Sequence, residues 1–303
     1  MGTLQSSHSD AMVSRKGKFY NAIGFQKGYN FVLWVIFLSL FLGFTLSRLP
    51  FLDFHGTMCS AIPKSKFNHA APGECFYLLQ LPCKWGVILH VATILPASIL
   101  VCLQFVPIIR RKAIALHRVI GRIVIVLSVL SIVGALIVLP RSFGGGLDVQ
   151  AFGWSLSIAF LWALFMGILS IKRGMIEQHR VWMIRAWFWA GCVITGRVAS
   201  IIAVKLQRSP LYYAMPCDKI NFMLQDRTLA LYPHCSSFFT GENKEQNVAV
   251  RADFNHPTSI VEVAAALDSS FGMAYFISFL IHIVGVEIYL NLTSGTSQRR
   301  RQV

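Results

Sequence analysis

Long apolar stretches alternate with short polar segments along most of this 303-residue sequence. A helix needs about 20 apolar residues to cross the roughly 30 Å hydrocarbon core of a bilayer. Six stretches approach or reach that length with few charges: Phe31–Ser47, Trp85–Ile109, Val119–Leu139, Phe152–Ile171, Val181–Val204 and Phe271–Leu290. The pattern predicts an all-α polytopic membrane protein, a bundle of six transmembrane helices.

Composition supports this prediction. Hydrophobic residues make up 55% of the chain and charged residues 14%, with a mean hydropathy of +0.57. A soluble domain usually has about one quarter of its residues charged, so a soluble protein is excluded. The first thirty residues lack the apolar core of a secretory signal. Gly2 and Ser6 fit the pattern for N-myristoylation, which the sequence leaves open.

The net charge of +15 is distributed unevenly along the chain. With the N-terminus in the cytosol, the inner segments hold fourteen cations and two acids, whereas the outer segments hold eleven cations and ten acids. This asymmetry follows the positive-inside rule and predicts that both termini are cytosolic. The basic excess therefore needs no nucleic-acid partner, and the partner that we expect first is the lipid bilayer.

The predicted organisation follows from the spans and their connections. The segment Thr258–Asp268 has the apolar periodicity of a short helix before the last span. We expect the longest outer loop to form a small lumenal or extracellular cap. The predicted parts are a cytosolic tail (1–30), five spans (31–204), the long outer loop (205–270), the sixth span (271–291) and a basic cytosolic tail (292–303).

Cysteines support the same orientation. Five of the seven lie in predicted outer segments, where an oxidising compartment permits disulfides. Cys217–Cys235 and Cys75–Cys83 are the candidate pairs, although spacing alone does not fix connectivity. We expect a membrane of the secretory pathway or the plasma membrane.

Three ionisable residues lie at one predicted depth, about 6–8 Å inside the cytosolic boundary. They are Arg122, Arg185 and Glu287, and Glu287 is the only acidic residue in a predicted span. A carboxylate is tolerated there mainly if an arginine provides paired hydrogen bonds. We therefore expect a structural ion pair between Glu287 and Arg122 or Arg185.

Four histidines lie in or at the entrance of predicted spans. His117 and His179 each begin a His-Arg-Val segment at the cytosolic boundary, and this weak repeat suggests duplicated helical hairpins. His90 and His282 lie deeper. Because two imidazoles from different helices can ligate a b-type haem, His117 with His179 and His90 with His282 are candidate haem-binding pairs.

The segments LHRVIGR (116–122) and HRVWMIRAW (179–187) each follow a basic inner loop. Over about 85–202 the chain resembles a family of predicted multi-pass membrane proteins, domain of unknown function 2306. The resemblance implies signature positions but assigns them no reaction: His117, Arg118, Gly121, Arg122, His179, Trp182, Met183 and Arg185. The layout is also distantly similar to that of six-helix b-type cytochromes.

Three hypotheses for function remain. The first is a haem-bearing transmembrane oxidoreductase. The second is a cofactor-free isomerase-like or cyclase-like membrane enzyme or binding protein, in which His117 or His179 moves protons while Arg122 and Arg185 hold an anionic or enolic oxygen of a lipophilic small molecule. The third is a non-enzymatic membrane scaffold. No HExxH, GxSxG or Walker motif is present in the sequence.

Overall fold

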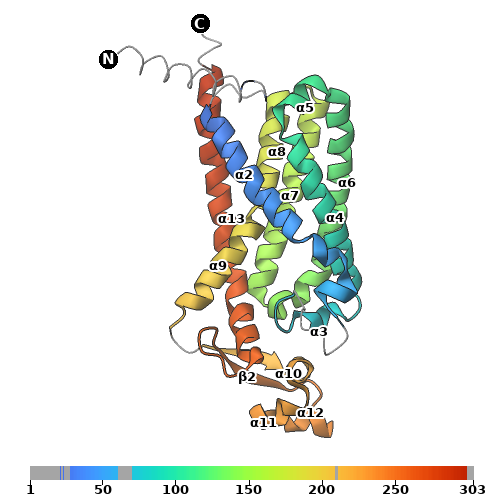
Figure 1. The fold of residues 1–303 in the computed structure, drawn as a ribbon, viewed down its shortest axis with the longest axis vertical. Coiled ribbons are helices and arrows are strands. Elements are labelled where there is room, and N and C mark those ends of the chain that lie inside the picture. The colour runs from blue at the N-terminus through green and yellow to red at the C-terminus, as the bar shows by residue number, and fades with distance from the viewer. Residues whose placement is uncertain (1–20, 22, 24–27, 61–69, 209–210, 299–303) are drawn as a thin grey trace, which may run out of the picture. The chain divides into compact units, whose positions relative to one another are not determined.

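The computed structural model describes residues 21, 23, 28–60, 70–208 and 211–298. The candidate myristoylation site at Gly2 and the arginines at 299–301 lie outside the described residues, as does most of the predicted N-terminal tail. The described elements are numbered as in Figure 1.

Within the described residues, six helical segments are long and apolar enough to cross a membrane, which confirms the predicted number of spans. The first is α2 (Gly28–Ser47) with the short turn η1 (Leu49–Leu52). The next four contain α4 (Cys83–Gln104), α6 (Ile114–Val138) with η3 (Leu139–Gly145), α7 (Leu147–Lys172), and α8 (Ile176–Ala190) with α9 (Cys192–Leu206). The sixth lies in α13 (Ile260–Gln298).

The chain divides into two units, comprising residues 1–50 with 91–131, and 51–90 with 132–303. The first unit contains α2, most of α4 and α6, and the short α5 (Pro107–Lys112). Val106 has the extended conformation that a following proline favours, so the chain turns there before α5 begins. The last turn of α5 carries three cations, where they complement the negative end of the helix dipole.

In the second unit, α13 packs against α7, α8 and α9, and α7 packs against α8 (Figure 1). The connection between α7 and α8 is short because Gly174 adopts a positive φ of 75° just after the end of α7. Near the middle of α13, an aromatic cluster of Phe152, Tyr275 and Phe279 fills the space between α7 and α13.

The fifth and sixth spans differ from the prediction. Val181–Val204 was expected to lie in one helix, but the helix is interrupted at Gly191, between α8 and α9. Thr258–Asp268 was expected to be a separate short helix, but α13 runs without a break from Ile260 to Gln298. No glycine or proline interrupts the run of good helix formers from 260 to 271, so this helix continues directly into the last span.

The segment between the fifth and sixth spans is folded. Strands β1 (Leu211–Pro216) and β2 (Asn247–Ala252) form an antiparallel pair, in which Leu211 lies opposite Ala252. Residues of β2 are alternately exposed and buried, as expected of a strand with one face on a core. Between the strands lie α10 (Cys217–Leu224), η4 (Gln225–Arg227), α11 (Thr228–Leu231), η5 (Pro233–Cys235) and α12 (Ser236–Thr240). The sequence analysis did not predict these strands.

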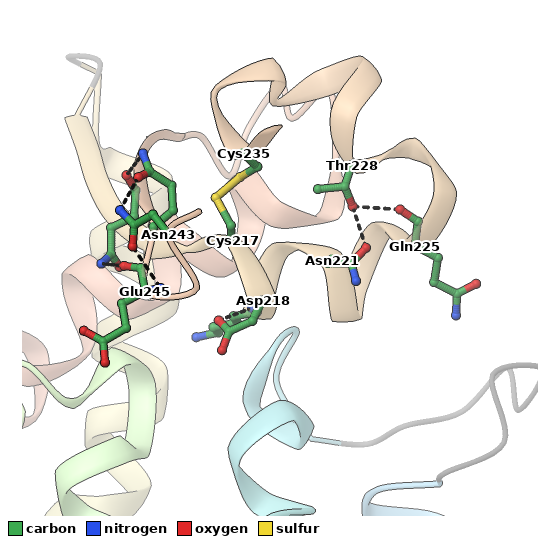
Figure 2. Close-up of a disulfide and its surroundings, with 11 residues drawn as sticks. Cys217, Asp218, Asn221, Gln225, Thr228, Cys235, Asn243 and Glu245 are labelled. Carbon is green, nitrogen blue, oxygen red and sulfur yellow. Dashed lines mark hydrogen bonds between the residues drawn. A yellow bond between two sulfur atoms is a disulfide. The ribbon is translucent and has the colours of Figure 1, made fainter. Parts of the chain in front are cut away.

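The structure contains two disulfides. Cys217 and Cys235 join α10 to η5, as predicted (Figure 2). The predicted Cys75–Cys83 pair is wrong, because Cys75 pairs with Cys59 and Cys83 is a buried free thiol. The Ala70 N–H donates to the Met58 carbonyl at 3.4 Å, which holds the end of η2 (Phe54–Met58) near the segment that leads into α3 (Glu74–Leu78). Cys83 instead lies in the first turn of α4.

Candidate functional site

His179 lies in the first turn of α8 and contacts the neighbouring helix α7. Its Nδ1 atom is 2.9 Å from the carbonyl oxygen of Gly167. A carbonyl can only accept a hydrogen bond, so Nδ1 carries the hydrogen and Nε2 of the neutral ring has the lone pair. Nε2 has no hydrogen-bond partner among the described residues. The ring is thereby fixed in one tautomer with its basic nitrogen available.

Arg185 lies further along α8 and faces α13. Its Nε and Nη2 atoms donate to the two carboxylate oxygens of Glu287 at 2.7 and 2.8 Å, a bidentate pair. The guanidinium carbon also lies 4.7 Å from the centre of the Trp182 ring. Glu287 uses two of the five N–H donors of Arg185, so the remaining donors can bind an oxygen of another molecule.

Trp182 and Gly167 connect these two features. Gly167 of α7 packs against Met183 and Trp182 of α8, and its carbonyl oxygen contacts His179. The Trp182 ring lies against the Arg185 guanidinium. We call His179, Trp182, Arg185 and Glu287 the His/Arg site. Within it, His179 contacts α7 and Arg185 contacts α13.

His282 occupies a different position in α13, beside the break between α8 and α9. Its Nδ1 atom is 2.5 Å from the Phe188 carbonyl oxygen, and its Nε2 atom is 3.1 Å from the hydroxyl of Thr195. An interrupted helix leaves carbonyls without their usual N–H donors, and inside a bilayer no water is there to replace them. His282 therefore provides a donor to a carbonyl at the break. Sequence reasoning did not identify Thr195.

The remaining sequence-predicted residues lie elsewhere. His117 and Arg122 belong to α6 in the first unit, so their pairing with residues of α8 and α13 stays a prediction. His90 belongs to α4 in the second unit. A methyl group on Gly134 of α6 would come within 2.6 Å of the His90 backbone nitrogen, so the two helices are in close contact there.

The histidines differ in how well they fit a haem. An axial ligand needs a ring nitrogen with a free lone pair. His179 fits this requirement, since its Nε2 atom is available and its Nδ1 atom donates to the Gly167 carbonyl. Metal-bound histidines typically have such a second hydrogen bond. His282 does not fit, because Phe188 and Thr195 engage both its nitrogens. The predicted pairing of His90 with His282 on one iron is therefore not supported by this donor set.

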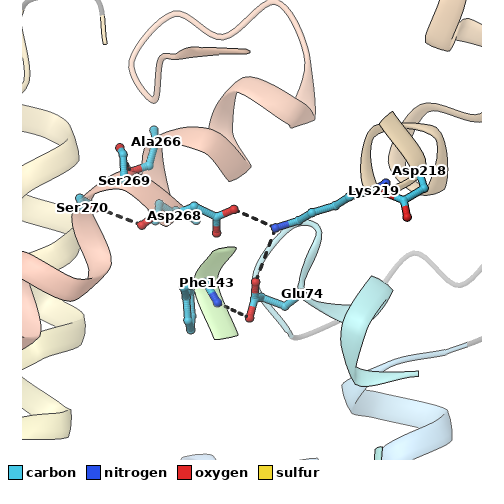
Figure 3. Close-up of polar contacts among 9 residues, drawn as sticks. Glu74, Phe143, Asp218, Lys219, Ala266, Asp268, Ser269 and Ser270 are labelled. Carbon is cyan, nitrogen blue, oxygen red and sulfur yellow. Dashed lines mark hydrogen bonds and ion pairs between the residues drawn. The ribbon is translucent and has the colours of Figure 1, made fainter. Parts of the chain in front are cut away.

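A second cluster of charges, which sequence reasoning missed, joins α3, α10 and α13. The Lys219 ammonium of α10 is 2.8 Å from a carboxylate oxygen of Asp268 in α13 and 3.9 Å from one of Glu74 in α3 (Figure 3). The other Glu74 oxygen accepts a hydrogen bond from the Phe143 backbone N–H at 3.0 Å. All three side chains are buried, with exposed fractions of at most 7%.

Burial determines the protonation of this cluster. Burial and the neighbouring Asp268 charge raise the pKa of Glu74 to about 7, although Lys219 and the Phe143 N–H act in the opposite direction. Burial likewise raises the pKa of the nearby Tyr77 to about 12. Glu74 thus binds a proton near neutral pH. Burial also raises the pKa of Asp268, although the neighbouring Lys219 acts in the opposite direction.

Comparison with known proteins gives a family and one relative. Residues 87–215 match a family described as Predicted membrane protein (DUF2306). The predicted family resemblance is confirmed. The matched region begins in α4 and ends in β1, so it includes the α8 residues of the His/Arg site. Ava biosynthesis cluster protein G from Aspergillus versicolor is 25% identical to this chain over an alignment of 328 residues. The alignment covers 93% of this chain and 94% of that protein. No solved structure matches the chain.

Proposed function

We propose that this integral membrane protein is a cofactor-free enzyme or binding protein for an amphiphilic small molecule. The observation that carries the proposal is the fixed tautomer of His179, whose available Nε2 can accept a proton from a bound molecule. Similarity to a protein named for a biosynthesis cluster supports a role in the chemistry of a small molecule.

Each residue of the His/Arg site has a distinct role in this proposal. His179 accepts or returns a proton, and the Gly167 carbonyl keeps its ring oriented. Arg185 holds an anionic or enolic oxygen with the donors that Glu287 leaves unused. Glu287 positions the guanidinium and balances its charge, and the Trp182 ring provides an apolar surface for the substrate. This division of roles describes an isomerase-like proton transfer.

The test is a comparison of cells that carry the wild-type chain, no chain, or His179→Ala. Lipophilic metabolites are profiled by mass spectrometry, and membrane levels of the protein are measured in parallel. We expect the His179→Ala cells to accumulate the same precursor as the cells without the chain, at unchanged protein level. His234→Ala is the matched control, because His234 is exposed in η5 far along the chain from the site.

Two results would contradict the proposal. A wild-type metabolite profile in His179→Ala cells would show that the imidazole is not needed. An unchanged profile in cells without the chain would instead favour the scaffold hypothesis.

A further inference from the structure

A basic hollow lies where the fifth span ends and the folded segment begins. It has a volume of about 560 Å³ and is lined by two separate parts of the chain, the end of α9 with the residues after it and the turn that follows β2. Its charged lining consists of Lys205, Arg208 and Arg251, together with a single acid, Asp253.

Hydrogen bonds between the two parts fix the hollow. The Asn255 side chain donates to the Lys205 carbonyl at 3.2 Å, and the Gln207 side chain donates to the Ala252 carbonyl at 3.3 Å. Asp253 shapes the turn itself by accepting the backbone N–H groups of Asn255 and His256 at 3.0 and 2.9 Å. The two backbone segments that carry the cations are therefore held together by hydrogen bonds.

The charges of the hollow are incompletely balanced. Asp253 pairs with Arg251 and also receives two backbone donors, so its negative charge is satisfied locally. Lys205 and Arg208 form no ion pair with any described residue. Two cations thus face the same 560 Å³ space without an acidic partner in the described chain, which favours an anion as the ligand.

An apolar surface leads directly to these cations. Val198, Ile201, Ile202 and Leu206 of α9 are exposed, with fractions of 58%, 41%, 51% and 69%. Their spacing places them along one side of the helix, since positions three and four apart are neighbours on a helix surface. In a membrane this stripe faces the acyl chains, and Lys205 and Arg208 follow at its end, where head groups lie.

We propose that this hollow binds the phosphate-bearing head group of an anionic membrane lipid, with its acyl chains along the exposed stripe of α9. The phosphate accepts charge-assisted hydrogen bonds from Lys205 and Arg208, with Arg251 at the edge of the site. The site is separate from the His/Arg site and does not depend on the function proposed for it.

The experiment counts lipids that stay bound to the protein. The full chain is reconstituted in nanodiscs of phosphatidylcholine with or without phosphatidic acid, and the retained lipids are measured by native mass spectrometry after release into detergent. We expect wild-type protein to retain phosphatidic acid in preference to phosphatidylcholine. The Lys205→Gln/Arg208→Gln variant should bind phosphatidic acid about tenfold more weakly, as expected for the loss of charge-assisted contacts.

The matched control removes the same charge from elsewhere in the folded segment. Arg227→Gln/Lys244→Gln changes two exposed cations that do not line the hollow, and it should bind phosphatidic acid like the wild type. Equal loss in both variants would overturn the proposal, because it would show binding by net charge alone.

A second arm of the experiment separates the two sources of phosphate. Inorganic phosphate is titrated into the detergent-solubilised protein, and displacement of phosphatidic acid is measured. We expect weak displacement, since free phosphate lacks the acyl chains that contact α9. Displacement at the same concentration as a soluble short-chain phosphatidic acid would overturn the assignment to a lipid and identify a site for free phosphate.

Discussion

Replacing Glu74 by glutamine removes the ionisable member of the buried charge cluster with little change in shape. In the unfolded chain this carboxyl group releases its proton near its ordinary pKa of 4.5, whereas burial in the folded protein raises that pKa to about 7. Between these values the folded state binds more protons than the unfolded state. Raising the pH through this window therefore lowers the free energy of unfolding.

The size of the effect follows from the two pKa values. One pKa unit corresponds to about 1.4 kcal/mol, so the rise from 4.5 to about 7 corresponds to about 3–4 kcal/mol of stability lost between pH 4 and pH 8. Glutamine resembles the protonated acid and cannot ionise. The Glu74→Gln variant should therefore match the wild type near pH 5 and be more stable than the wild type near pH 8.

The assay is denaturant unfolding in detergent at a series of pH values, with the difference between variant and wild type taken at each pH. Histidines and acids that do not contact Glu74 titrate equally in both proteins, so the difference reports Glu74 together with Asp268, whose charge acts on it. Glu177→Gln is the matched control, since Glu177 is exposed at the start of α8. A Glu74→Gln variant whose stability falls with pH as steeply as that of the wild type would refute the reasoning.

Four further predictions concern stability and cofactor content. Lys219→Met should lower the free energy of unfolding by about 3–5 kcal/mol, because it leaves a buried aspartate without its cation. Gly134→Ala should cost about 1–3 kcal/mol in a thermal or denaturant assay, since its methyl group would meet the backbone of α4, whereas Gly43→Ala in α2 meets nothing within 4 Å and should be neutral or stabilising. Glu287→Gln should reduce the yield of monodisperse protein in size-exclusion chromatography, and an unchanged yield and melting temperature would show that its arginine partner does not need it. Purified protein should lack a Soret band, and a redox-sensitive Soret band would restore the haem hypothesis.

The fold was predicted well where a single physical effect dominates. The six spans follow from the cost of placing polar residues in hydrocarbon, and that cost acts on each stretch of sequence separately. The break at Gly191 was missed because an isolated glycine is tolerated within a helix, and the donor that stabilises the break, His282, lies 91 residues later in another helix. Strands β1 and β2 were missed because each is short and they are separated by thirty residues.

The candidate site was predicted in part, for a related reason. An ionisable residue in an apolar stretch is conspicuous, so Arg185, Glu287 and His179 could be selected individually. The partner of His179 could not, because it is a backbone carbonyl on α7 and every residue carries one.

Ionisable residues in polar segments are not conspicuous in the sequence. Glu74, Lys219 and Asp268 resemble ordinary solvated residues in the sequence, and only the fold reveals that they are buried together. The protonation of these three residues depends on how α3, α10 and α13 pack together. The two carboxylates, Glu74 and Asp268, are 194 positions apart in the sequence. A pH-dependent stability that disappears in Glu74→Gln would thus demonstrate that these three segments are packed together.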